Sequence, residues 1–244
     1  MTGVSALSIR GVTRRFGGLI AVNDMSFQLA EHEVLGLIGP NGSGKTTMMN
    51  LISGALKPDA GEIRLFGADI AGRPANAISR EGVSRTFQIV RVLPGLNVLE
   101  NVTAGGVFGH ARRWGRELED FARAQLVRVG MEGAENRPVE SLTYIDQKRL
   151  ELARALAAEP RVLLLDEWLA GLNPTELRTG IELIDALRAD VRTIVIVEHV
   201  MDAIRSLCDR CVVMNGGLKI AEGTPAEVLA DADVIRAYLG DEDV

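Results

Sequence analysis

Several features that mark other classes of protein are scarce or missing in this sequence of 244 residues. No run of about 18 apolar residues occurs, so no membrane-spanning helix is expected. The N-terminal segment MTGVSALSIR lacks a basic patch followed by an apolar core, so no secretory signal is expected either. Aromatic residues make up only 4% of the chain, which disfavours a surface that stacks nucleic-acid bases. The net charge of -6 disfavours binding to phosphate backbones. These absences predict a soluble, cytosolic, globular chain.

Cysteine is also scarce, and the two that occur, Cys208 and Cys211, form a single C-x-x-C. One interpretation is a redox or metal-binding pair. The other is two small apolar residues, buried where a helix passes into the strand CVVMN. No second cysteine pair is present to complete a zinc site. Because free cysteine is among the most buried residue types, the sequence favours the second interpretation.

Buried strands are the main pattern that the sequence does contain. The apolar runs Val34–Ile38, Leu163–Leu165 and Ile194–Val197 are typical of strands covered on both faces. Helical patterns separate these runs, which indicates a parallel sheet covered by helices. Closer to the N-terminus, apolar residues alternate with polar ones between 25 and 29, as in a strand with one exposed face.

The middle of the chain, residues 89–159, is expected to be a helical insertion between sheet strands. One amphipathic helix is predicted from Trp114 to Val129. Its predicted apolar face consists of Trp114, Leu118, Phe121, Ala122, Leu126 and Val129. A second helix is predicted from Gln147 to Ala158. Near the end of the chain, Thr224 followed by Pro225 and Glu227 predicts the capped start of another helix.

The strongest motif is Gly39-Pro-Asn-Gly-Ser-Gly-Lys-Thr46, which fits the phosphate-loop pattern G-x-x-x-x-G-K-S/T. It follows a buried strand and opens a helical pattern over 46–56. Glycines allow backbone N–H groups to turn inward as an anion nest, and the helix N-terminus adds its positive dipole. Lys45 supplies a charge for the β- and γ-phosphates, and Thr46 supplies a hydroxyl for Mg²⁺. The sequence therefore predicts a nucleotide site.

A second motif supplies the carboxylates that such a site needs. Four apolar residues lead into Asp166 and Glu167. Since ligands bind at the carboxyl ends of strands in α/β sheets, Asp166 is placed to hold Mg²⁺ through water. Glu167 is placed to polarise the attacking water. The doublet alone is weak, but with the phosphate loop it completes both halves of a Mg·ATP site.

With these motifs in their order, the chain resembles the ATP-binding cassette (ABC) family of transporter ATPases over its whole length. Gln88 matches the Q-loop, which senses the γ-phosphate and Mg²⁺. Leu142–Gln147 stands at the signature position, and Ala170–Asn173 stands at the D-loop. His199 matches the switch histidine that contacts the γ-phosphate. Phe16 stands where the family stacks an aromatic ring on adenine; the alternative is a core residue.

The resemblance implies an α/β P-loop NTPase fold with a mixed, mainly parallel sheet, an N-terminal antiparallel β subdomain and an inserted helical subdomain. Residues 1–244 would form one nucleotide-binding domain, with 1–88 and 160–244 as ATPase core and 89–159 as helical subdomain. ATP and Mg²⁺ are the implied cofactors. The expected catalytic residues are Glu167, His199, Lys45 and Gln88, and the expected metal ligands are Thr46, Gln88 and Asp166. The expected nucleotide contacts are Phe16, Gly39, Asn41, Gly42, Ser43, Gly44, Lys45, Thr46, Thr47, Thr143 and Asn173.

The chain departs from the family pattern at the signature, usually Leu-Ser-Gly-Gly-Gln. A hydroxyl survives at Thr143, but Tyr144 and Ile145 replace the glycines and Asp146 adds negative charge. A β-branched residue resists positive φ and crowds a close phosphate approach. We therefore expect that the site completed by this signature is impaired, which favours a heterodimer of two different cassettes. Asn173 for aspartate and Trp168 for proline are further departures.

Residues 82–91 with 96–102, and the tail 223–240, resemble the high-affinity branched-chain amino-acid importer ATPases. Residues 166–174 are similar to that subgroup too, apart from Trp168. That subgroup implies a second ATPase, two membrane permeases and an extracytoplasmic binding protein, with this chain peripheral on the cytoplasmic side of the membrane. Ile89–Leu96 is the expected docking surface for the permeases, its apolar residues serving as partner contacts rather than core. ATPases for urea or amide transport, or for lipid or polysaccharide transport, remain alternatives.

Two rivals from other classes also fit a phosphate loop. A soluble ABC ATPase acting on nucleic acid or ribosomes usually carries two cassettes, a coiled-coil insertion or basic arms, whereas this chain shows one cassette and is acidic. No nucleic-acid partner is therefore expected. A P-loop kinase would phosphorylate an acceptor, and Gln88, the signature helix and His199 argue against it.

Overall fold

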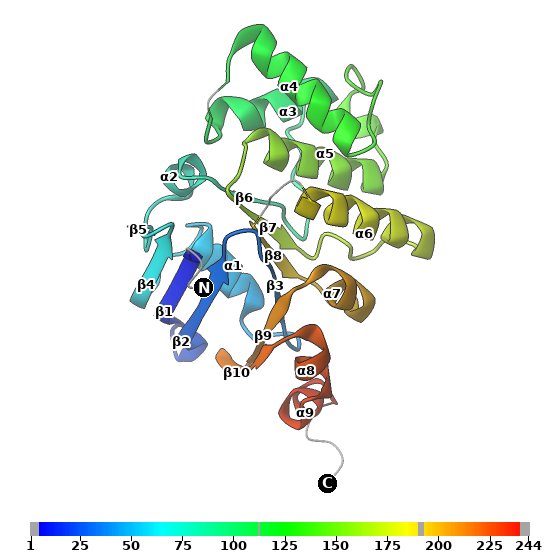
Figure 1. The fold of residues 1–244 in the computed structure, drawn as a ribbon. Coiled ribbons are helices and arrows are strands. Elements are labelled where there is room, and N and C mark those ends of the chain that lie inside the picture. The colour runs from blue at the N-terminus through cyan, green and yellow to red at the C-terminus, as the bar shows by residue number, and fades with distance from the viewer. Residues whose placement is uncertain (1–4, 112, 190–192, 240–244) are drawn as a thin grey trace.

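The computed structural model describes residues 5–111, 113–189 and 193–239. Within this part of the chain, the first sheet has four strands in the order β2-β1-β4-β5, and its pairings are antiparallel (Figure 1). The strands are β1 (Ser5–Phe16), β2 (Leu19–Ala30), β4 (Ala60–Leu65) and β5 (Ala68–Asp69). Met25, Phe27 and Leu29 of β2 are buried between exposed neighbours, as their alternation predicts.

The second sheet has six strands among the described residues, in the order β10-β9-β3-β8-β7-β6. Its strands are β3 (Val34–Ile38), β6 (Val83–Arg85), β7 (Val162–Asp166), β8 (Thr193–Val197), β9 (Arg210–Asn215) and β10 (Leu218–Gly223). Every pairing is parallel except that of β9 with β10. The carboxyl ends of β3, β6, β7 and β8 therefore meet at one edge of the sheet, and the predicted mixed sheet is confirmed.

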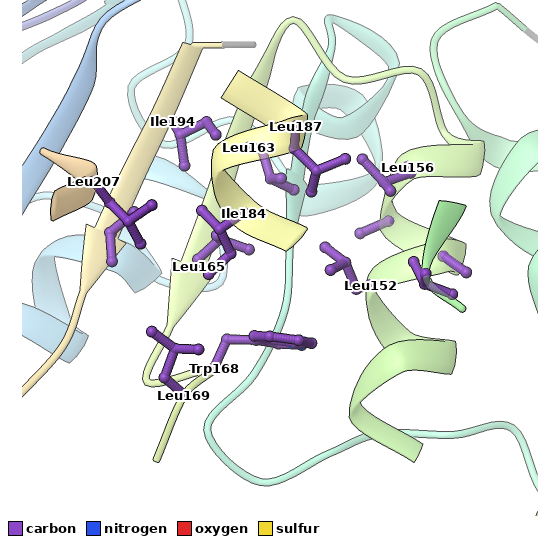
Figure 2. Close-up of a cluster of buried hydrophobic side chains, with 14 of the residues drawn as sticks. Leu152, Leu156, Leu163, Leu165, Trp168, Leu169, Ile184, Leu187, Ile194 and Leu207 are labelled. Carbon is purple, nitrogen blue, oxygen red and sulfur yellow. The ribbon is translucent and has the colours of Figure 1, made fainter. Parts of the chain in front are cut away.

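Two core clusters lie on opposite faces of the parallel sheet. Leu35 and Leu37 of β3 face α1 (Lys45–Ile52) and the antiparallel sheet. Val34 and Ile38 face the other way, toward α6 (Pro174–Ala189) and α7 (Met201–Leu207). Figure 2 shows part of this second cluster, where residues from β7, β8, α5, α6 and α7 meet. A strand buried on both faces explains why the sequence is apolar at consecutive positions.

The helices between β6 and β7 gather at one end of the molecule (Figure 1). They are α3 (Val98–Phe108), α4 (Gly115–Arg128), η1 (Val139–Ser141) and α5 (Tyr144–Ala157); the shorter α2 (Ala75–Arg80) precedes β6. All four lie within the expected insertion, residues 89–159, whose exact boundaries stay a prediction. A capping box of Asn97 and Glu100 begins α3.

Three helix boundaries differ from the sequence expectation. Trp114 was expected on the apolar face of the helix now seen as α4, but it precedes the helix and is 66% exposed. The pattern over 46–56 predicts a longer α1 than the structure has. The helix ends at Ile52 because Gly54 adopts a positive φ. Helix α5 begins at Tyr144 rather than at Gln147, and its N-cap is Thr143, where the spacing of Thr143 and Asp146 predicts a capped start.

The C-terminal helices are α8 (Pro225–Ala230) and α9 (Ala232–Leu239). Thr224 and Glu227 form the predicted capping box at α8. The cysteines form no disulfide and are buried between the end of α7 and β9, as the apolar interpretation predicts. Gly240, the last residue of the subgroup-like tail, lies outside the described residues. No helix in the described part of the chain has the length and apolar character needed to span a membrane.

Candidate functional site

The phosphate loop runs from the carboxyl end of β3 into the first turn of α1. Gly39 and Gly44 have φ values of 146° and 105°. A Cβ at Gly39 would lie 2.0 Å from the Met214 carbonyl oxygen, and one at Gly44 would lie 2.3 Å from the Ala21 carbonyl oxygen. Both positions therefore require glycine for conformation and for space. The result is a backbone loop whose curvature leaves a cradle at a helix N-terminus.

Lys45 is buried inside this loop. Its Nζ donates to the carbonyl oxygens of Gly39 and Pro40 at 2.7 and 2.9 Å. Burial lowers the pKa of Lys45, while the nearby carboxylates of Glu167 and Asp166 act in the opposite direction. The ammonium is therefore held in place by backbone groups that a phosphate could replace.

A cavity of about 460 Å³ opens beside the loop. Among the sequence-predicted residues it is lined by Phe16, Asn41, Gly42, Ser43, Gly44, Lys45, Thr46, Thr47, Gln88 and Glu167. The Phe16 ring is 43% exposed, with the Arg14 guanidinium 4.8 Å from its centroid, so it belongs to no core cluster among the described residues. An aromatic face thus lies at one part of a cavity whose other part is a phosphate cradle.

Three sequence-predicted catalytic side chains meet at the edge of this cavity. Gln88 Nε2 donates to Glu167 Oε2 at 2.7 Å, and His199 Nε2 lies 3.0 Å from Glu167 Oε1. These residues follow β6, β7 and β8, whose parallel register brings their carboxyl ends together. Glu167 has a left-handed φ of 49°, which is unusual for a residue other than glycine. Its N–H donates to the Val197 carbonyl oxygen at 2.8 Å.

Asp166 lies behind this cluster and makes a buried ion pair. Arg85 Nη2 is 2.6 Å from Asp166 Oδ2, and the two side chains are 5% and 2% exposed. Arg85 Nη1 also donates to Asn50 Oδ1 of α1 and to Ser53 Oγ at the C-cap of that helix, at 2.7 and 3.1 Å. Asp166 Oδ1 is buried and has no hydrogen-bond partner among the described residues. One carboxylate oxygen is therefore fixed, and the other is left for a ligand.

The signature and D-loop residues lie elsewhere. Thr143 Oγ1 accepts from the Asp146 N–H at 3.3 Å, and Asn173 Oδ1 accepts from the N–H groups of Thr175 and Glu176 at the start of α6. Neither Thr143 nor Asn173 lines the phosphate-loop cavity. Ile145 does not need the positive φ that a glycine signature suggested, because it belongs to the first turn of α5. The expected strain there is absent, and only its bulk and the charge of Asp146 remain.

Sequence reasoning missed several residues that contact the cluster. Arg85 ends a short strand, and a lone arginine in Val83–Arg85 could have indicated a buried partner. Glu198 continues the apolar run of β8, is 1% exposed, and accepts from the Leu169 N–H at 2.6 Å. Burial raises its pKa to about 7. Lys148 and Glu151 of α5 are buried too, but helical periodicity alone does not distinguish them from surface charges.

The comparisons with known proteins agree with this geometry. The family model described as ABC transporter matches residues 22–170, and that described as branched-chain amino acid ATP-binding cassette transporter matches residues 219–244. The high-affinity branched-chain amino acid transport ATP-binding protein LivG of Salmonella typhimurium is 43% identical, over 96% of this chain and 98% of that protein.

Solved structures agree as well. A crystal structure of an ATP-binding cassette of an ABC transporter in its ADP conformation has a TM-score of 0.87 and 28% identity, covering 97% of this chain and 99% of that one. A dimeric cassette in a post-hydrolysis state, bound to ADP and Pi, has a TM-score of 0.81 and 26% identity, covering 90% of this chain and 98% of that one. The site combines a phosphate cradle with a carboxylate that glutamine and histidine hold. Together with that geometry, these likenesses show that the chain belongs to the ABC transporter family, as one of its ATP-binding, ATP-hydrolysing cassettes.

Proposed function

We propose that this chain binds and hydrolyses ATP to energise a multi-subunit ABC importer for branched-chain or related amino acids. One observation carries the ATPase assignment: Glu167 is held by Gln88 and His199 at the edge of the cavity that Lys45 enters. The cargo is proposed from LivG, which is named for branched-chain amino acid transport, and from the C-terminal family match. The membrane crossing itself is assigned to other chains.

In the proposed reaction, each cluster residue has one task. The N–H groups of the phosphate loop and the Lys45 ammonium bind the β- and γ-phosphates and stabilise the charge that develops on them. Glu167 positions a water, or takes its proton, for attack on the γ-phosphorus. His199, released from Glu167, contacts the γ-phosphate. Phe16 stacks on adenine. Because Glu167 is already hydrogen-bonded on both oxygens, binding of nucleotide must compete for Gln88 and His199.

The residues present suit a Mg²⁺ ion. Asp166 Oδ1 is a buried oxygen with no partner among the described residues, and Oδ2 is fixed by Arg85, so the free oxygen is oriented before a metal arrives. Thr46 and Gln88 line the phosphate-loop cavity and offer neutral oxygens, which Mg²⁺ accepts alongside water and phosphate. Bound there, the ion would neutralise phosphate charge. We propose that Thr46, Gln88 and Asp166 hold it.

We further propose that the working unit is a heterodimer of two different cassettes. Thr143 and Asn173 lie outside this chain's own cavity, which suits residues that would complete the partner's nucleotide site. Ile145 places a branched side chain, and Asp146 a negative charge, in the first turn of α5, where a phosphate would need space and positive charge. The test is ATP turnover by the isolated chain against the mixed complex. Vigorous, cooperative hydrolysis by a pure homodimer would contradict the proposal.

The permeases are proposed to dock beside residues 89–96. Ile89 is 82% exposed and Leu93 is 39% exposed, while Val92 packs against the core, so the segment is part contact surface and part core. A cavity of about 590 Å³ adjoins it, lined by Leu93, Phe108 and Arg154 among others. Arg154 Nη1 is buried and has no hydrogen-bond partner among the described residues. We therefore expect the permease segment that docks here to supply an acceptor for it.

Purification from membranes tests this assembly. The chain is tagged, and detergent-solubilised complexes are compared for the native chain and for Leu93→Glu, with Leu218→Glu as a control at another exposed leucine. We expect two membrane permeases and a second cassette to co-purify with the native chain and the control, and the permeases to be lost from Leu93→Glu. A chain that purifies alone in all cases would contradict a place in a transporter on the cytoplasmic side of the membrane. To detect the proposed extracytoplasmic binding protein, the purification is repeated with a branched-chain amino acid added.

A further inference from the structure

A lysine is fully buried on the inner face of α5. Lys148 is 1% exposed, and its Nζ donates to the carbonyl oxygens of Glu167 and Trp168 at 3.2 and 2.9 Å. The Tyr144 ring centroid lies 5.1 Å away on the same helix. Burying an ammonium is costly unless it is hydrogen-bonded. Here its acceptors are the backbone carbonyl oxygens of Glu167, the proposed catalytic residue, and of Trp168, which follows it. The ammonium of Lys148 therefore ties α5 to this segment.

Trp168 returns the contact. Its ring is 1% exposed, and its Nε1 donates to the Lys148 carbonyl oxygen at 3.1 Å. The ring extends from the end of β7 toward α5, the helix that carries Leu152 (Figure 2). On α6, a Cβ added at Gly180 would lie 3.2 Å from the Trp168 ring. Each residue thus binds the other's backbone. A proline at position 168, the usual family residue, has no side-chain N–H to make this bond.

Two further buried acidic residues, Glu151 and Glu198, connect this region to the segments around Gln88 and His199. Glu151, one turn along α5, accepts from the N–H groups of Phe87 and Arg91, which lie on either side of Gln88, at 3.2 and 3.0 Å. Glu198, which precedes His199, accepts from the Leu169 N–H. Glu151 and Glu198 both interact electrostatically with Lys148. Lys148 therefore faces both buried acidic groups, and Arg154 of the same helix shares the interaction with Glu151.

Glu167 needs this support because its backbone is in the left-handed region. Its N–H is bonded to β8 through Val197, and its carbonyl is bonded to α5 through Lys148. A residue other than glycine keeps such a conformation only where its surroundings over-determine it. Removing the bond from α5 leaves one side of Glu167 without support.

We propose that Lys148 and Trp168 form a reciprocal clamp that positions Glu167 from α5, the helix whose first turn carries the signature residues. The proposal rests on Glu167 being the catalytic carboxylate. Through the clamp, α5 would link the partner's nucleotide site, which its first-turn residues are proposed to complete, to the catalytic group of this chain's own site. Coupling of this kind is expected along a continuous chain of buried hydrogen bonds.

The first experiment separates positioning from folding. ATP turnover and nucleotide affinity of the assembled transporter are measured for Lys148→Met, Lys148→Arg and Trp168→Phe, with the exposed Lys57→Met as control. We expect kcat per complex to fall about 10- to 100-fold in Lys148→Met, as for a misplaced catalytic group, with nucleotide affinity within about twofold. Lys148→Arg should recover most of the loss, because it keeps a buried donor. Trp168→Phe keeps the ring packing and should show a smaller fall in kcat.

Three results would overturn the clamp. One is a kcat in Lys148→Met within twofold of the native value. Another is an equal loss of kcat and nucleotide affinity that Lys148→Arg does not reverse. If Lys148→Met does not fold, an unchanged kcat in Trp168→Phe would serve as the contrary result. Failure of the proposed ATPase function looks different, because then the native complex and Lys57→Met would show no turnover either.

The second experiment observes the clamp directly. The chain has two tryptophans, Trp168, which is buried, and Trp114, which is exposed, so labelling this chain alone with 5-fluorotryptophan gives two fluorine NMR resonances. Trp114→Phe assigns them. We expect the Trp168 resonance to shift when a non-hydrolysable ATP analogue closes the assembled complex, and the shift to be lost in Lys148→Met. An unshifted Trp168 resonance in the native complex, or an equal shift in Lys148→Met, would contradict coupling through α5.

Discussion

Replacing Glu198 with glutamine tests the electrostatics of the buried layer. In the folded chain, burial raises the pKa of this carboxyl from 4.5 to about 7. The Leu169 N–H and the Lys148 ammonium oppose the shift, and the Glu167 carboxylate adds to it. Oε2 has no hydrogen-bond partner among the described residues, so no donor there stabilises a charged carboxylate. The native state therefore binds this proton more tightly than the unfolded state does.

The sign follows from this difference. The stabilising contribution is fully present below pH 4.5 and is lost as the pH rises through about 7, because the native chain must then bury a charge. Each pKa unit corresponds to about 1.4 kcal/mol, so about 3 kcal/mol is lost in total, and about 2–3 kcal/mol of it between pH 5 and pH 8. Glutamine keeps the acceptor for Leu169 and does not titrate. We expect Glu198→Gln to gain that much stability relative to the native chain over this range.

The assay is urea unfolding followed by circular dichroism at pH 5 and pH 8. The native chain, Glu198→Gln and a control, Glu182→Gln, which lies exposed on α6, are compared. Only Glu198→Gln should change the pH dependence of the unfolding free energy. Parallel pH dependences in the native chain and Glu198→Gln would refute the assignment of a raised pKa to this residue.

Three other substitutions probe the nucleotide site. Glu167→Gln should retain ATP but turn over at least about 100-fold more slowly in steady-state hydrolysis, and an unchanged kcat would reject its role. Lys45→Ala should weaken ATP binding by about 10- to 100-fold in calorimetry, since charged hydrogen bonds are lost, and near-native affinity would reject its phosphate role. Arg85→Met should lower the unfolding free energy by about 3–5 kcal/mol by leaving Asp166 buried and unpaired, and adding Asp166→Asn should restore part of it. Equal stability of the native chain and Arg85→Met would show that the pair does not matter.

The sheet and the phosphate loop were predictable because their signals are local. A buried strand is apolar at consecutive positions, and the loop must contain glycine where a Cβ would meet the backbone at Gly39 and Gly44. The parallel arrangement then brings Glu167 and His199 together without further information. The capping box at Thr224 is equally local, since each partner lies within one helical turn of the other.

The rest depends on contacts between residues far apart in the chain. Arg85 and Asp166 pair across 81 positions, and nothing near Arg85 in the sequence indicates its partner. Lys148 lies on a helix with charged neighbours, so its burial follows only from where Trp168 lies in the fold. Trp114 was misplaced because periodicity counts an aromatic residue as core even where a helix has not yet begun. The proposed roles of the site residues, and the division of the chain into subdomains, stay predictions.

Uptake into proteoliposomes shows whether this chain powers amino-acid import. The native chain is reconstituted with its co-purified permeases and second cassette, with the binding protein outside and ATP enclosed, and uptake of radiolabelled leucine is followed against urea as the competing cargo. We expect ATP-dependent accumulation of leucine that Glu167→Gln abolishes. Leucine uptake that is equal with and without ATP, or that survives in Glu167→Gln, would contradict a role for this chain in powering amino-acid import.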